Sequence, residues 1–140
     1  MFSANIIAAY IINWCHYHNT TITNLKLQKL LYFVQKEFYY IKKVRLIKED
    51  FYAYQLGAVI PEIYTKYSIF ASFNLPIQNL MIQNFYYFNC FVIINSILNN
   101  YGYKSTWELV ELSQKEDSWK YNYKIFGSKA LIPYECIIRF

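Results

Sequence analysis

The most informative run of residues in this chain is Thr23-Asn24-Leu25-Lys26-Leu27-Gln28-Lys29-Leu30-Leu31-Tyr32-Phe33. It opens on a threonine, whose side-chain oxygen accepts a backbone N–H at the start of a helix. Apolar residues then recur at three- and four-residue steps, which places them on one helix face: Leu27, Leu30, Leu31, Val34, Phe38 and Ile41. Lys26, Lys29 and Lys36 fall on another face. The pattern predicts a helix over residues 23–43.

Composition favours a mainly α protein with a single compact domain. The chain has 140 residues, enough for one domain with a sizeable core. Hydrophobic residues make up 56% and charged residues 16%, which excludes a disordered chain. Three glycines and three prolines are too few for the turns of an all-β domain. We therefore expect about five to seven helices and, at most, one minor extended element.

Local signals place the other elements. A serine at position 3 favours a helix over 3–18, Pro61 is suited to a first helical turn, and Ser105 with Glu108 matches a capping box. Further helices are expected over 61–73, 86–101, 105–114 and 134–140. Alternation within 46–56 predicts a short extended segment, while 74–84 and 116–119 are expected to be loops.

The sequence offers no catalytic or metal-binding motif. Cys15 and His18 lie one helical turn apart, but a structural zinc site needs about four ligands and no second such pair exists. We therefore interpret His16 and His18 as a histidine pair at a helix end. The paired carboxylates fit solvated charges, and the three isolated glycines form no phosphate-binding loop. We predict that the protein is not an enzyme and takes no cofactor.

The chain carries no signal for secretion or membrane insertion. Three widely spaced cysteines do not form a disulfide framework. Residues 1–5 lack the basic segment of a signal peptide. The longest apolar run, 85–98, is broken by Asn89 and Asn95 and is shorter than the roughly 18 residues of a membrane span. We expect a cytoplasmic protein without a membrane partner.

The net charge of +5 leaves nucleic-acid binding open as an alternative. Residues 42–45 form a basic cluster, which also suits the C-terminal end of a helix. Two aromatic runs, 38–40 and 85–88, contain the kind of side chains on which bases stack. Core packing explains the same aromatic residues, and we favour it.

A second informative string is Tyr54-Gln55-Leu56-Gly57-Ala58-Val59-Ile60-Pro61-Glu62-Ile63-Tyr64. Together with Thr23–Phe33, it resembles the pattern of the Panacea-domain family. This family includes phage-associated GepA-like proteins and SocA-like antitoxins. Its pattern continues with an element similar to residues 113–119 and closes with a short helix that corresponds to residues 132–140. Ala8 and Ala9 correspond to its small-residue patch. The resemblance covers nearly the whole chain, so we expect one Panacea domain over residues 1–140.

The chain departs from the family pattern at three places. Tyr54 stands where the family has tryptophan, and Ala58 stands where it has proline. Ser113-Gln114 replaces the threonine-histidine pair, so any acid–base or ligand role of that histidine does not carry over. We expect these changes to affect the choice of partner and not the fold.

The resemblance implies an antitoxin that neutralises a cognate toxin by direct protein–protein binding. The alternative within the family is a proteolytic adaptor that delivers the toxin to an ATP-dependent protease. The alternative of another class is the basic nucleic-acid-binding module. Eight motif positions are nominated for partner binding, each with a purely structural role as its alternative: Lys26, Lys29, Tyr32, Tyr54, Gly57, Glu62, Tyr64 and Trp119.

Overall fold

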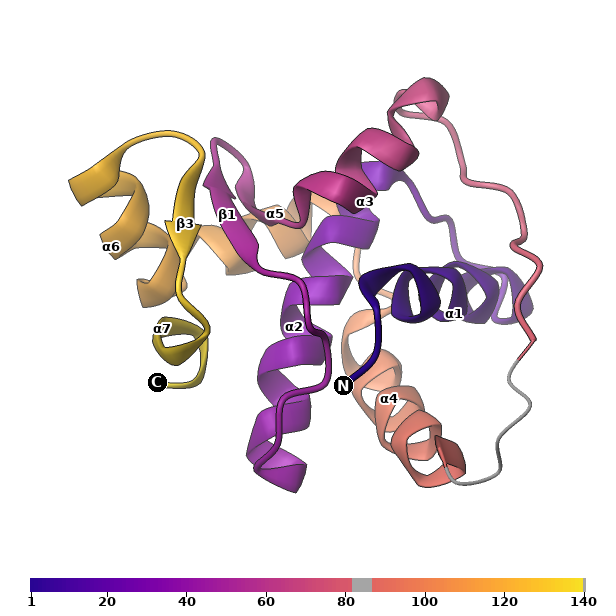
Figure 1. Ribbon diagram of the computed structural model, residues 1–140. Coiled ribbons are helices and arrows are strands. Elements are labelled where there is room, and N and C mark those ends of the chain that lie inside the picture. The colour runs from indigo at the N-terminus through magenta and orange to yellow at the C-terminus, as the bar shows by residue number, and fades with distance from the viewer. Residues whose placement is uncertain (82–86, 140) are drawn as a thin grey trace.

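The computed structural model describes residues 1–81 and 87–139, and in these residues it contains seven α-helices, a 3-10 helix and three strands (Figure 1). In chain order the elements are α1 (Ala4–Tyr17), α2 (Asn24–Lys42), β1 (Phe51–Tyr54), β2 (Gly57–Val59), α3 (Pro61–Lys66), η1 (Ser68–Phe70), α4 (Phe88–Tyr101), α5 (Thr106–Gln114), α6 (Asp117–Phe126), β3 (Ala130–Ile132) and α7 (Tyr134–Ile138). The prediction of a mainly α domain with a minor extended element is confirmed.

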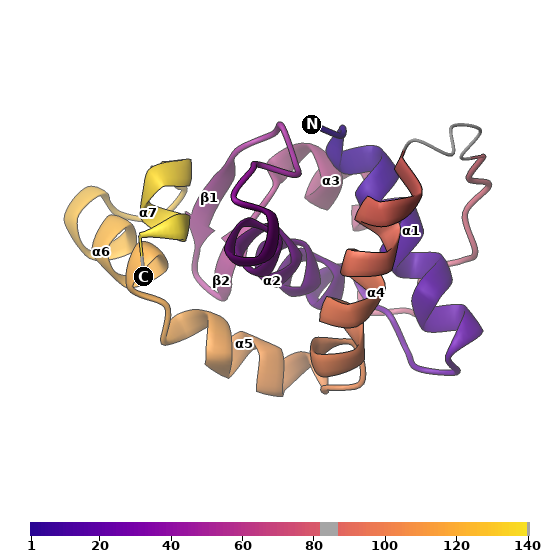
Figure 2. The same cartoon turned by 90° about the horizontal axis from the view of Figure 1, so that it is seen from below.

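Helix α2 is the centre of the fold. Viewed from below, it lies in the middle, with α1 and α4 on one side, α5 beneath it and the strands on the other side (Figure 2). It contacts α1, α3, α4, α5, α7 and β2. The apolar face predicted from the sequence is buried from Leu27 to Phe38. Ile41 on the same face is 53% exposed because it lies in the last turn, before Lys43 ends the helix in a left-handed conformation.

Three predicted helix starts are confirmed by their local chemistry. The Thr23 side chain accepts from the backbone N–H of Lys26 at 3.3 Å, and that of Ser105 accepts from Glu108 at 3.2 Å. Pro61 is the first residue of α3, and the acidic Glu62 lies in its first turn. These signals depend on neighbours within one turn, so the sequence alone reveals them.

Helix α3 is shorter than the predicted range of 61–73. It ends at Lys66 and is followed by the 3-10 helix η1. The Ser68 hydroxyl donates to the carbonyl of Thr65 at 2.7 Å, which offers that carbonyl a partner outside the helix. Ala71 then adopts a positive φ of 50°. Part of the predicted loop at 74–84 and the first residue of the predicted helix at 86–101 lie outside the described residues.

The predicted loop at 116–119 is wrong, because α6 begins at Asp117 and continues to Phe126. Its fully buried side chains are Ser118 and Asn122, so the face that packs inward is partly polar. An apolar period therefore does not reveal this helix. The last helix, α7, ends at Ile138, and residue 140 of its predicted range lies outside the described residues.

The three strands form an antiparallel sheet in the order β2-β1-β3. In the first pair Tyr52 lies opposite Val59, and in the second Phe51 lies opposite Ile132. The extended segment predicted within 46–56 is therefore confirmed as β1. The sheet ties the C-terminal part of the chain to the middle part, because β3 pairs with a strand that precedes it by more than seventy residues.

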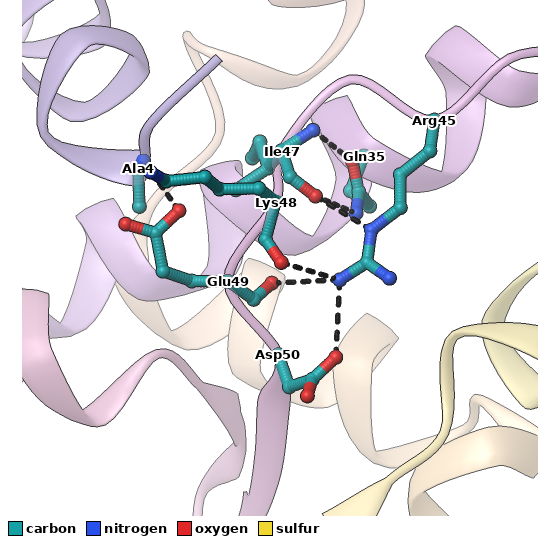
Figure 3. Close-up of polar contacts among 7 residues, drawn as sticks. All are labelled: Ala4, Gln35, Arg45, Ile47, Lys48, Glu49 and Asp50. Carbon is teal, nitrogen blue, oxygen red and sulfur yellow. Dashed lines mark hydrogen bonds and ion pairs between the residues drawn. The ribbon is translucent and has the colours of Figure 1, made fainter. Parts of the chain in front are cut away.

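The connection between α2 and β1 is held by a cluster of polar contacts (Figure 3). The Gln35 amide binds both backbone groups of Ile47, donating to its carbonyl at 3.0 Å and accepting from its N–H at 2.8 Å. Arg45 donates to the carbonyls of Ile47, Lys48 and Glu49. The loop that leads into the sheet therefore has its backbone groups satisfied by side chains.

Glu49 in the same cluster caps α1 from a distant part of the chain (Figure 3). Its carboxylate accepts from the backbone N–H of Ala4 at 2.9 Å. The residue before α1, Ser3, makes no side-chain capping bond of its own. A negative charge at this position also suits the positive end of the helix dipole.

We expect Glu49→Ala to lower the free energy of unfolding by about 1 kcal/mol, because the first turn of α1 loses its cap. Glu49→Gln keeps an oxygen acceptor and should lose less. Asp50→Ala is the control, since it removes an exposed ion pair with Arg45 and should cost about 0.5 kcal/mol or less. Urea denaturation measures all three. An Asp50→Ala loss equal to that of Glu49→Ala would show that the cap has no separate effect.

Candidate functional site

We call Thr23–Phe33 the first motif, Tyr54–Tyr64 the second motif and residues 113–119 the third motif. Lys29, in the first motif, binds the second motif from inside the protein. Its side chain is fully buried, and its Nζ donates to the carbonyl of Ala58 in β2 at 2.7 Å. Burial lowers the pKa of the Lys29 ammonium to about 7. No carboxylate forms an ion pair with it among residues 1–81 and 87–139. The charged form is therefore poorly solvated, which explains the direction of the pKa shift.

Gly57 makes room for this contact. Its φ is +113°, and a Cβ placed there would lie 2.3 Å from the Ser113 Oγ and 2.9 Å from the Lys29 Nζ. The Ser113 hydroxyl is buried and has no hydrogen-bond partner in the described part of the chain. Strand β2 therefore approaches α2 and α5 closely at a position that only glycine fits.

Two more side chains of the first motif bind the backbone of the second. The Gln28 oxygen accepts from the N–H of Ile60 at 3.0 Å, and its amide donates to the Asn24 oxygen at 3.0 Å. Asn24 in turn donates to the carbonyl of Tyr64 in α3 at 2.9 Å. All the side chains in this chain of bonds are buried, except that of Tyr64, which is 39% exposed. The polar part of the first motif thus fixes β2 and α3 against α2.

The first motif also holds the third. The Tyr32 hydroxyl donates to Glu116 at 2.9 Å and lies 2.7 Å from the Ser118 Oγ. Lys36 forms an ion pair with the same glutamate. Burial raises the pKa of Tyr32, so the phenol stays protonated and can donate. Trp119 reaches the hairpin directly, where its Nε1 donates to the carbonyl of Tyr54 at 2.8 Å.

Lys26 is buried as well. Neither Lys26 nor Lys29 therefore lies on an exposed basic face of α2, as the sequence had suggested. The Lys26 Nζ donates to the carbonyl of Thr21 at 2.9 Å and to the hydroxyl of Thr20 at 3.2 Å. Burial lowers its pKa. The acceptor of Lys26 lies in the loop before α2, and the acceptor of Lys29 lies in β2. The helical period of the sequence cannot predict either of these contacts.

The eight nominated residues therefore divide into two groups. Four of them are buried and hold the fold together: Lys26, Lys29, Tyr32 and Gly57. The other four keep exposed surface. Tyr54 and Trp119 are partly exposed, whereas Glu62 and Tyr64 are exposed on α3. The rings of Tyr54 and Tyr64 lie 5.8 Å apart. The structure thus brings the hairpin and α3 positions together at the surface.

An apolar groove lies beside Tyr64, where α3, η1, the hairpin turn and α5 surround the start of α2. We call it the α3–α5 groove. It has a volume of about 450 Å³ and is lined by Thr23, Asn24, Leu25, Leu56, Tyr64, Ser68, Ala71, Ser72, Thr106 and Trp107. Trp107 is 65% exposed, Tyr64 39% and Leu56 36%. Large side chains with this much exposure, gathered around one groove, are typical of a binding surface.

Sequence reasoning missed Leu56 and Trp107. Leu56 lies inside the second motif, in the turn between β1 and β2, where a solvent-facing leucine is unusual. Trp107 follows directly after the start of α5, and in the sequence it reads as a member of the capping box. No clear sequence signal marked Trp107, because the apolar Val110 three residues later allows a shared apolar face, and only the structure shows Val110 buried and Trp107 exposed.

The other hypotheses find less support in the structure. Of the first aromatic run, Phe38 is buried, which fits core packing. In the second run, residues 85 and 86 lie outside the described residues, and Tyr87 and Phe88 are 40% and 63% exposed, so core packing does not explain these two side chains. No group of three potential metal ligands occurs in the described ranges. Cys15 is buried with its thiol pKa raised to about 11, so it is a poor ligand and nucleophile.

No helix in the described part of the chain is both long and apolar enough to cross a membrane.

Residues 27–88 match the family model described as "Antitoxin SocA-like, Panacea domain". The match begins inside the first motif and includes the hairpin and α3. No curated protein and no solved structure matches the chain.

Proposed function

Because residues 27–88 carry the Panacea domain of the SocA-like antitoxin family, we propose that this protein is an antitoxin that neutralises a cognate toxin by binding it directly. The family match supports an antitoxin role and a non-catalytic one. We also propose that the domain extends over residues 1–140. Helices α1, α4, α5 and α7 all pack on α2, and the family match begins inside the motif of α2.

The observation that carries the proposal is the α3–α5 groove. Half of its ten lining residues come from the two family strings: residues 23–25 from the first, and Leu56 and Tyr64 from the second. The buried members of the same strings fix these lining residues in place through Asn24, Gln28 and Lys29. We propose that the family pattern builds a rigid apolar groove and that the toxin docks there.

The proposal gives the two groups of motif residues different tasks. Tyr54, Glu62, Tyr64 and Trp119 lie at or near the surface and contact the toxin. The buried group, Lys26, Lys29, Tyr32 and Gly57, contributes by holding the groove in shape. Trp107 joins the contact residues as an anchor, because large aromatic side chains dominate the binding energy of many interfaces.

We expect Trp107→Ala to abolish or strongly reduce protection when the chain is co-expressed with the product of the neighbouring gene. A truncated aromatic anchor costs about 2 kcal/mol, which is a loss of at least tenfold in affinity. Phe126→Ala is the matched control, since this aromatic residue on α6 is 67% exposed and lies outside the groove. Cell growth and pull-down of the two proteins are the readouts.

Two outcomes would contradict the proposal. A neighbouring product that is harmless alone, or stays toxic beside the wild-type chain, removes the antitoxin role. Protection that survives Trp107→Ala and fails in Phe126→Ala moves the interface away from the groove. Toxin abundance in a protease-deficient host separates masking from proteolytic delivery, because only delivery lowers the amount of toxin and depends on the protease.

A further inference from the structure

A second groove lies between α2, α4 and the end of α5, and we call it the α2–α4 groove. It has a volume of about 600 Å³, and its described lining residues do not overlap with those of the α3–α5 groove. Among the apolar lining residues, Phe33 and Ile97 are buried, whereas Ile41, in the last turn of α2, is 53% exposed. The groove therefore offers apolar surface to a partner at a place separate from the proposed toxin site.

Lysines outnumber glutamates in the α2–α4 groove. Lys36, Lys104 and Lys115 line it together with Glu37 and Glu116. Lys36 forms an ion pair with Glu116, so these two charges cancel. Two lysines and one glutamate remain, which leaves the lining with a net charge of +1.

The remaining glutamate already has a partner within the fold. Glu37 accepts a hydrogen bond from the Tyr101 hydroxyl at 3.1 Å. Burial and the neighbouring Glu37 carboxylate raise the pKa of Tyr101, so the phenol stays protonated and keeps donating. Lys104 and Lys115, by contrast, form no ion pair among residues 1–81 and 87–139. The two cations of the groove that lack a carboxylate are therefore Lys104 and Lys115.

Helix α5 separates these two lysines. Figure 2 shows α5 beneath α2, beginning beside the end of α4. Lys104 precedes α5 and Lys115 follows it, so the two cations lie at opposite ends of a helix about 14 Å long. Each lysine also follows a helix, where a cation suits the negative end of the dipole. That role is local to each helix and does not require both side chains to line one groove.

From this arrangement we infer that the α2–α4 groove binds an acidic segment of a partner protein. Carboxylates of the segment meet Lys104 and Lys115, and an apolar side chain between them packs on Leu112, the lining residue of α5 that lies between the two lysines. The inference goes beyond the proposed function, because it gives the protein a second binding surface of different chemistry.

The groove suits an acidic protein segment better than a nucleic acid. Two lysines without partners match a few carboxylates, whereas a phosphate backbone would also bring charge against Glu37 and Glu116. Stacking of bases needs an accessible ring. Phe33 is only 4% exposed, and its ring is stacked on that of Tyr101 at 4.7 Å.

The first test uses a library of random peptides of about twelve residues displayed on phage. Peptides are selected on the wild-type protein after depletion on the double variant Lys104→Gln/Lys115→Gln, so that those retained depend on the two lysines. We expect the retained peptides to be enriched in aspartate and glutamate next to an apolar residue. Neutral or basic peptides, or no enrichment over the double variant, would overturn the inference.

Point variants then measure the contribution of each charge with one selected peptide. Lys104→Gln and Lys115→Gln should each raise its Kd by about two- to fivefold, as expected for one exposed ion pair. The wild-type Kd should also rise between about 50 and 300 mM NaCl, because salt screens exposed charges. Lys124→Gln is the matched control, since Lys124 is an exposed lysine on α6 outside the groove. A Kd that stays the same in both groove variants, or changes equally in Lys124→Gln, would refute the role of the groove.

A single-stranded DNA of about twenty nucleotides is the competing probe. We expect the double variant to leave any binding of this DNA unchanged. If the double variant abolishes DNA binding and the wild-type protein retains no acidic peptide, the groove is a nucleic-acid site and the inference is wrong. Neither probe involves the toxin or Trp107, so these results are independent of the co-expression experiment.

Discussion

Gly57→Ala is expected to lower the free energy of unfolding by about 2 to 6 kcal/mol. One contribution is backbone strain, because a residue with a side chain rarely adopts a φ of +113°, at a cost of about 1 to 3 kcal/mol. The other is overpacking. The new methyl group would lie 2.3 Å from the Ser113 Oγ, and the adjustment costs a further 1 to 3 kcal/mol or so.

Gly127→Ala is the matched control for the strain. Gly127 also has a positive φ, of +89°, but a Cβ there meets no atom within 4 Å. Its loss should be about 1 to 3 kcal/mol from strain alone. Ser113→Ala, added to Gly57→Ala, removes the nearest clashing atom and should restore part of the stability. Equal losses in the two single glycine variants, measured by denaturant unfolding, would show that the close approach of β2 is not tight.

The second large effect is a dependence of stability on pH that comes from Lys29. The pKa of its amine is about 7 in the folded protein and 10.5 as an ordinary lysine. Between these values the unfolded chain binds more protons than the folded one, so the free energy of unfolding rises with pH. The full cost of the charged form below pH 7 is about 5 kcal/mol, and the rise from pH 6 to pH 8.5 is about 2 kcal/mol.

Lys29→Met tests this assignment, because it keeps a side chain of similar length without a titrating group. We expect the variant to lose the rise in stability between pH 6 and pH 8.5, although the carbonyl of Ala58 loses its donor. The slope is therefore the readout, and not the absolute stability. Measurements should stop near pH 8.5, because Cys15 has a raised pKa and makes stability fall at higher pH. A wild-type slope that persists in Lys29→Met would assign it to another group.

Much of the helical framework could be predicted because its signals are local. Thr23, Pro61 and Ser105 each act within one turn of a helix start, and the apolar period of α2 shows its buried face directly. Helix α6 was missed because Ser118 and Asn122 are buried on its inner face. The partner of the Ser118 side chain, Tyr32, is far away in the sequence.

The candidate site was predicted less completely for the same reason. The family strings drew attention to Tyr54 and Tyr64, which do lie beside the groove. The burial of Lys26 and Lys29 depends on tertiary packing, which a helical period does not report. Trp107 belongs to the site because α5 folds back against the start of α2, and that placement is a property of the whole fold.

Four of the bonds between the motifs join a side chain on one partner to a main-chain atom on the other. Lys29 binds the carbonyl of residue 58, Gln28 the N–H of residue 60, Asn24 the carbonyl of residue 64 and Trp119 the carbonyl of residue 54. A carbonyl is present whichever amino acid occupies the position, so alanine at 58 and tyrosine at 54 keep the same acceptors. Side chains at these positions of the hairpin and α3 can therefore be exchanged without removing the acceptors that hold the two elements against α2.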